Sequence, residues 1–128
     1  MKKLVYIFTF LLMAAGLSSC NAEIKNITTK NLIGTWDLVS DTIVYSDGTE
    51  TTTKCTSGEY IVITEDSYSV FSGTRETKYP FTYSDPHMMI DGVSLYDIRS
   101  LTRTQLVLSS NIVIPFIQTD HLYTYKRR

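Results

Sequence analysis

The amino-acid sequence predicts an all-β protein in which an antiparallel up-and-down meander closes into a small β-barrel of about eight strands. Two observations support this fold class. Beyond residue 32 the chain consists of short runs in which β-branched and aromatic residues alternate with polar ones, and no window keeps the 3.6-residue apolar period of a helix. Turn residues separate most of these runs by only two to five positions, and such short connections favour hairpins between neighbouring antiparallel strands.

The chain begins with a segment typical of a signal peptide. Lys2 and Lys3 give it a basic start, and residues 4–17 form an uncharged apolar run. This run is shorter than the roughly 20 residues that a helix needs to cross a bilayer. We therefore expect residues 1–19 to be removed and not to remain as a membrane helix.

The Leu-Ser-Ser-Cys sequence that ends at Cys20 resembles the lipobox of bacterial lipoproteins. The resemblance implies cleavage before Cys20 and lipidation of its thiol. Acyl chains at this position hold a protein on a membrane without crossing it, so the expected location is the cell envelope, on the periplasmic or surface face of the outer membrane. Ordinary secretory cleavage, with Cys20 left as a free thiol, is the alternative.

A single domain follows the signal peptide. Residues 20–31 are expected to form the lipidated start and a tether, and residues 32–128 the barrel domain. Removal of the signal peptide leaves ten basic against thirteen acidic residues, and this acidic balance argues against nucleic-acid binding, which needs a basic surface. Besides Cys20 the only cysteine is Cys55, so the domain has no internal disulfide and depends on its core. We expect Cys55 to be a half-buried strand residue.

The elements of the domain are expected in a simple order. One helical turn at residues 28–32, capped by Thr28 or Thr29, comes first. The first strand, residues 34–45, changes the parity of its apolar positions near Ser40, which predicts a bulge. The remaining strands are expected at residues 49–55, 59–64, 67–72, 77–83, 87–90, 93–101, 105–109 and 121–126.

Two alternatives remain open at this stage. An immunoglobulin-like sandwich has a similar size, but it needs a longer crossover connection and, in true immunoglobulin domains, two cysteines. The apolar run from Ile112 to Ile117 is either a further strand kinked at Pro115 or an exposed apolar lip suited to a ligand, a partner protein or the membrane surface.

The first strand opens with Gly34-Thr35-Trp36 directly after the expected helical turn, and Arg127 stands near the end of the last strand. This arrangement resembles the lipocalins. The stretch from Ile98 to Leu108 is similar to the small lipocalin-like domains of bacterial lipoproteins, in which Gly-x-Trp is paired with a late Ile-x-x-Leu-Thr-x-x-x-Leu-x-Leu pattern. The resemblance covers residues 32–128 and implies that Gly34, Trp36 and Arg127 close one end of the barrel, with the arginine stacked over the indole. The shorter chain implies a shallower barrel than in full-length lipocalins.

The sequence holds few groups suited to catalysis. It contains no phosphate-binding glycine loop, no Cys/His cluster with metal-ligand spacing and no Gly-x-Ser-x-Gly motif, so we expect no enzyme activity, no cofactor and no metal. His87 and His121 each lie near an aspartate in the sequence, Asp85 and Asp120 respectively. We interpret both pairs as turn and strand-end residues, because no third ligand or nucleophile accompanies them.

Aromatic and aliphatic residues remain as the candidates for an apolar binding site. Those expected to line it are Trp36, Tyr60, Tyr68, Phe81, Tyr83, Met88 and Leu95. The sequence therefore predicts a non-catalytic, lipid-anchored envelope protein that binds or carries an apolar small molecule in its barrel. Alternatively, the same side chains fill the interior as core, and the barrel is an interaction module that docks another envelope protein.

Overall fold

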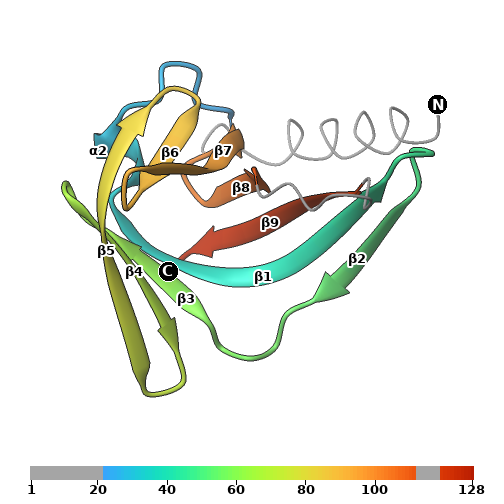
Figure 1. Cartoon of the computed structure of the whole chain (residues 1–128), viewed down its shortest axis with the longest axis horizontal. Coiled ribbons are helices and arrows are strands. Elements are labelled where there is room, and N and C mark those ends of the chain that lie inside the picture. Colours follow the sequence, from blue (N-terminus) through green and yellow to red (C-terminus); the bar gives the residue numbers. More distant parts are fainter. Residues whose placement is uncertain (1–21, 112–118) are drawn as a thin grey trace.

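The computed structural model describes residues 22–111 and 119–128 (Figure 1). Cys20 and the run from Ile112 to Ile117 lie outside these residues. Within the described ranges, one helical turn and nine strands follow each other: α2 (Thr29–Leu32), β1 (Gly34–Tyr45), β2 (Glu50–Lys54), β3 (Tyr60–Ile63), β4 (Ser67–Ser72), β5 (Arg75–Ser84), β6 (His87–Ile90), β7 (Val93–Leu101), β8 (Gln105–Ser110) and β9 (Thr119–Arg127). The predicted all-β class and the predicted order of the strands are confirmed.

The strand pairings close the sheet into a barrel. The strands lie in the order β2-β1-β3-β4-β5-β6-β7-β8-β9, all neighbours are antiparallel, and β9 also pairs with β1. Eight strands therefore form the closed barrel, as the sequence predicted, and β2 is an additional strand outside it. Closure leaves the eight barrel strands with no long unpaired edge, which stabilises an isolated β-domain of this size.

Strand β1 is long enough to pair with two strands along one of its edges. Its first residues, 34–37, pair with β3, and residues 40–44 pair with β2. Its other edge pairs with β9 from Trp36 to Tyr45. The second half of β1, strand β2 and the first half of β9 thus form a three-stranded extension that projects beyond the barrel (Figure 1).

A bulge in β1 keeps its inner face continuous. The register with β9 shifts between Leu38 and Ser40, which confirms the bulge predicted near Ser40. Leu38 lies opposite Tyr125, and Asp41 lies opposite Tyr123. Because Tyr123 and Tyr125 share one face of β9, the bulge brings Asp41 to the same inner face as Leu38.

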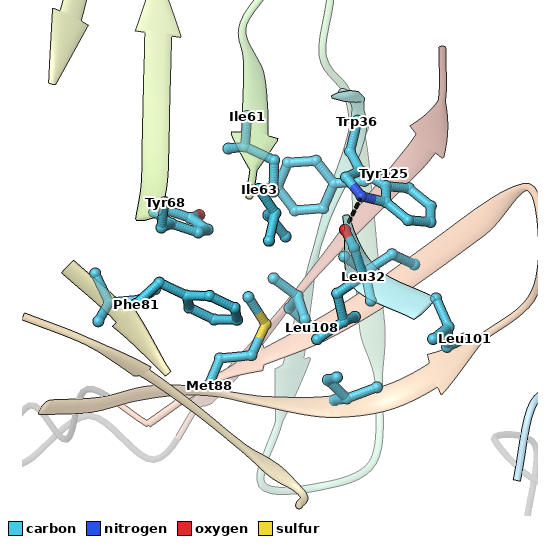
Figure 2. Close-up of a cluster of buried hydrophobic side chains, with 13 residues drawn as sticks. Leu32, Trp36, Ile61, Ile63, Tyr68, Phe81, Met88, Leu101, Leu108 and Tyr125 are labelled. Atoms are coloured by element: carbon cyan, nitrogen blue, oxygen red, sulfur yellow. Dashed lines mark hydrogen bonds between the residues drawn. The ribbon is translucent and has the colours of Figure 1, made fainter. Parts of the chain in front are cut away.

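One cluster of thirteen buried side chains fills the barrel (Figure 2). Strands contribute alternate residues to it, such as Ile61 and Ile63 from β3 and Leu106 and Leu108 from β8, as the two-residue period requires. The largest side chains that are almost completely buried are Trp36, Leu32, Ile61, Ile63, Met88, Leu101, Leu106 and Leu108. Burial of each apolar side chain of this size contributes about 1.5–3 kcal/mol to folding.

The segment before the first strand is packed against the barrel. The Ile24 N–H donates a hydrogen bond of 2.7 Å to the Leu101 carbonyl, and Ile24 and Ile27 lie against the core. The side chain of Asn31 accepts a hydrogen bond of 2.8 Å from the Thr28 N–H at the start of α2. The residues expected as a tether are thus attached to the barrel from Ile24 onward, because their two isoleucines are half-buried against the core. No helix within residues 22–111 and 119–128 is long and apolar enough to cross a membrane.

Candidate functional site

Arg127 closes one end of the barrel. Its guanidinium carbon lies 4.1 Å from the centre of the Trp36 ring. The Nε atom donates to the Arg103 carbonyl at 2.7 Å, while Nη1 and Nη2 donate to the carbonyls of Ile33 and Asn31, both at 2.9 Å. The last strand is thereby joined to the turn before β8 and to the chain that enters β1. On the inner side, the Trp36 Nε1 atom donates to the Leu32 carbonyl at 2.9 Å (Figure 2).

Gly34 gives Arg127 the space for this arrangement. A Cβ atom built on Gly34 would lie 2.6 Å from the Arg127 Nη1 atom, and the backbone φ of Gly34 is +144°, a conformation that side-chain-bearing residues rarely adopt. The structure thus brings together Gly34, Trp36 and Arg127, the three residues that the sequence suggested for this end.

Six of the seven candidate pocket residues gather in or against one cluster. Trp36, Tyr68, Phe81 and Met88 are buried in the core. Tyr83 and Leu95 are half-buried and pack against it.

The placement of Tyr60 must be corrected, because it lies on the outer face of the barrel. Its neighbour Ile61 points inward, and successive residues of a strand point to opposite faces. The Tyr60 ring stacks on Phe71 with a centroid distance of 4.7 Å. The guanidinium carbon of Arg128 lies 4.1 Å from the centre of the Tyr60 ring, and Arg128 also forms an ion pair of 2.6 Å with Asp37.

Five of the tyrosines in or against the core lie close to one another, and we call them the tyrosine cluster: Tyr68, Tyr79, Tyr96, Tyr123 and Tyr125. Tyr68 and Tyr125 are buried, and the other three are half-buried against the core. The rings of Tyr96 and Tyr123 meet edge to face, with centroids 6.0 Å apart and an interplanar angle of 84°. Tyr79, Tyr96 and Tyr123 therefore keep part of their aromatic surface exposed to solvent.

Four phenols of this cluster have a raised pKa, which favours their neutral form. Burial is the main cause that raises the pKa of Tyr68, Tyr96, Tyr123 and Tyr125, and the negative charge of Glu59 raises each of them further. Tyr68 and Tyr125 also lie close enough for each to influence the pKa of the other. Neutral phenols both donate and accept hydrogen bonds, so the cluster offers polar tips on an otherwise apolar surface.

Two carboxylates lie close to the tyrosine cluster and make its rim acidic. Asp41 faces the His121 ring, with 3.4 Å between Oδ1 and Nδ1, and the His121 ring stacks on Tyr123 with centroids 6.1 Å apart. In the described part of the chain, Glu59 forms no ion pair. Partial burial and the charges of Asp41 and Glu59 raise the pKa of the Cys55 thiol, so half-buried Cys55 remains a neutral thiol, as expected of a non-reactive residue.

The histidines pair with aspartates that the sequence order did not indicate. His87 Nδ1 lies 2.6 Å from Asp97, its direct cross-strand neighbour, and not beside Asp85. Partial burial opposes ionisation of Asp97, but hydrogen bonds from Asn111 and His87 outweigh it and lower the pKa of this carboxyl. Residues directly opposite each other on neighbouring strands approach more closely than residues two apart along the chain. His87 therefore contacts Asp97 and not Asp85.

Asp41, Glu59, Tyr96 and Tyr123 were missed as site residues, because their proximity depends on the β1 bulge and on barrel closure. Among residues 22–111 and 119–128, no group of three His, Cys, Asp or Glu side chains is arranged to hold a metal ion. The site is thus a set of neutral phenols on an apolar core beside two carboxylates. Comparison of the chain with models of protein families, with curated proteins and with solved structures found no match.

Proposed function

We propose that the protein is a non-catalytic binding protein that takes an apolar small molecule at the tyrosine cluster. The observation that carries this proposal is the position of Tyr79, Tyr96 and Tyr123, which are half-buried directly against the barrel core. A ligand that covers their rings removes further aromatic surface from water, at about 25 cal/mol for each Å². Their hydroxyls supply the few polar groups that orient a guest in an apolar site.

The charges beside the cluster favour one class of ligand. Asp41 and Glu59 act on Tyr123 together, so an anionic head group meets repulsion there. A cationic head group is attracted by the carboxylates and by the faces of the aromatic rings, which contribute about 0.5–2 kcal/mol through cation–π contact. The proposed ligand is therefore an apolar molecule with a cationic or neutral polar end.

The ligand proposal can be tested by calorimetric titration. We expect dodecyltrimethylammonium to bind more tightly than dodecanoate, both being added below their micellar concentrations. The variants Tyr96→Ala and Tyr123→Ala should weaken binding at least tenfold, which corresponds to about 1.4 kcal/mol. Tyr60→Ala is the matched control, because Tyr60 is also half-buried but lies on the outer face.

Two results would overturn the ligand proposal. One is a protein that binds neither probe and releases no small molecule in native mass spectrometry. The other is an equal loss of affinity in the Tyr60→Ala and Tyr123→Ala variants, since it would place the binding surface outside the tyrosine cluster.

We further propose that Cys20 carries a lipid that holds the protein on the outer membrane, as its lipobox-like sequence implies. The Ile24–Leu101 hydrogen bond fixes the barrel a few residues after this position, which supports a domain that stays close to the membrane surface. The Cys20→Ala variant should lose its acyl mass and move from the membrane fraction to the soluble fraction. Membrane retention of that variant without acylation contradicts the anchor.

A second candidate function is favoured by the dense filling of the closed end, where Trp36, Leu101 and Leu106 are almost completely buried. In this alternative the solid barrel is a scaffold that docks another envelope protein through the run from Ile112 to Ile117, whose placement the structure does not describe. The double variant Ile114→Ser with Phe116→Ser should then abolish capture of the partner and leave binding of the small-molecule probes unchanged. The opposite pattern supports the ligand proposal.

A further inference from the structure

Strand β2 has one edge that no described strand covers. It stands at the end of the strand order and pairs with β1 alone, and all five of its residues, Glu50–Lys54, are exposed. An exposed edge strand presents unpaired backbone N–H and C=O groups that can extend the sheet with another strand. The three-stranded extension carries this edge away from the barrel (Figure 1).

The hydrogen bonds at both ends of β2 show which residues supply the free groups. The Tyr45 N–H donates to the Thr49 carbonyl, and the Cys55 N–H donates to the Val39 carbonyl, each at 2.9 Å. In an antiparallel pair, hydrogen-bonded positions alternate with positions that direct their backbone groups to the other edge.

Because positions 49 and 55 bond to β1, positions 51 and 53 do so as well. The alternate residues, Glu50, Thr52 and Lys54, therefore direct their N–H and C=O groups to the open edge. Their side chains all lie on one face of the sheet, the face of Thr42, whose hydroxyl oxygen is 2.9 Å from that of Thr52.

We propose that the occupant of this edge is β2 of a second copy of the same chain. The strand sequence Glu-Thr-Thr-Thr-Lys has opposite charges at equal distances from its central residue, Thr52. When two such strands pair antiparallel about Thr52, Glu50 of each copy lies opposite Lys54 of the other. The three free N–H groups and three free C=O groups of each copy then all find partners across the edge.

The charges also select this register over others. A shift by two residues places Glu50 opposite Thr52 and leaves charged groups unpaired, whereas the symmetric register forms two opposite-charge pairs, which stabilise neighbouring strands. The interface is isologous, with a twofold axis between the two Thr52 residues. It joins the two extensions into one sheet with the strand order β9-β1-β2-β2-β1-β9.

The interface is small, so the dimer depends on concentration. Five residues on each side bury far less than the roughly 1,200 Å² of a stable protein interface. Association is therefore weak in dilute solution and is promoted where copies are confined together. Confinement on a membrane rests on the proposed Cys20 anchor, but the pairing itself does not.

Disulfide trapping of the full chain in cells tests the pairing. In a Cys55→Ser background, Thr52→Cys should give a covalent dimer on mild oxidation, because Cα atoms of a hydrogen-bonded antiparallel pair are about 5.5 Å apart, within the range for a disulfide. Thr51→Cys is the matched control on the same exposed strand. In the proposed register position 51 lies opposite position 53, so the two introduced thiols stand too far apart to bond.

Charge exchange in the Thr52→Cys background supplies the decisive comparison. Glu50→Lys alone and Lys54→Glu alone each bring like charges together and should lower the dimer yield at least fivefold. The double variant, Glu50→Lys with Lys54→Glu, restores opposite charges and should restore the yield, which also shows that the single variants failed for reasons of pairing and not of folding.

Three results would overturn the proposal: equal trapping at positions 51 and 52, no recovery in the double variant, or a trapped product whose mass is not twice that of the chain. The same trapping on concentrated purified protein separates this inference from the proposed anchor and ligand. Tyr123→Ala and Cys20→Ala should leave trapping in that concentrated sample unchanged.

Discussion

Arg127 and Trp36 join the two ends of the barrel sequence in one contact. The guanidinium carbon lies 4.1 Å from the centre of the indole ring, while its three nitrogens donate to three backbone carbonyls. Strand β9 is thus fastened to the entrance of β1 by a side chain as well as by the strand pairing. Stability measurements at this contact test whether it holds the barrel closed.

Replacement of Arg127 by lysine should destabilise the protein by about 2–3 kcal/mol, because an ammonium cannot reach three carbonyls in a fixed plane and stack on the ring. Urea unfolding followed by fluorescence of Trp36, the single tryptophan, measures the change. Lys126→Ala, at an exposed neighbouring position, serves as the control. A loss below about 0.5 kcal/mol in Arg127→Lys, the usual range for surface substitutions, contradicts the closing role.

Gly34→Ala should cost about 2–4 kcal/mol, since it adds backbone strain at φ +144° to a 2.6 Å contact with Arg127 Nη1. In an Arg127→Ala background the contact is gone and only the strain remains, so the cost of Gly34→Ala should fall. Urea unfolding of the two single variants and the double variant gives the coupling energy. Purely additive effects would show that the two residues do not interact.

Leu108→Ala should lower the free energy of unfolding by about 2–5 kcal/mol, because the side chain is completely buried and its truncation leaves a cavity. Val93→Ala is the control, as Val93 is 58% exposed and should change stability by less than about 0.5 kcal/mol. Thermal or urea unfolding distinguishes the two variants. Similar small effects at both positions would argue against a solid core at Leu108.

The buried tyrosines predict a loss of stability at alkaline pH. Burial and the neighbouring phenols of Tyr125 and Tyr96 raise the pKa of Tyr68 well above its ordinary value, which is about 10 in an unfolded chain. The unfolded state therefore releases this proton first, and stability falls as the pH rises above about 10.

Above about pH 10, the free energy of unfolding of the Tyr68→Phe variant should fall less steeply than that of the unchanged protein. The difference in slope should be up to about 1.4 kcal/mol per pH unit. Urea unfolding at a series of alkaline pH values measures the slope. Tyr45→Phe, at a 40% exposed position, is the matched control. An unchanged slope in Tyr68→Phe would show that this phenol ionises equally in both states.

The alternation of apolar residues and the short turns predicted almost every strand within one or two residues of its observed bounds. Strand parity is a local property, because each residue points to the face opposite its neighbour. Parity also places Tyr60 outside, because its position alternates with inward-facing Ile61 and Ile63, whereas aromatic character alone does not indicate a face.

The sequence therefore determined the fold class and the strand order, whereas the meeting of Gly34, Trp36 and Arg127 at one end was expected only from a family resemblance. Only the tertiary structure decided which residues face each other across strands. The β1 bulge places Asp41 opposite Tyr123. The pairing of β8 with both β7 and β9 brings the ring centroids of Tyr96 and Tyr123 to 6.0 Å from each other. Such contacts depend on register and on barrel closure, which couple residues distant in the chain, whereas local patterns fix only the face on which each residue lies.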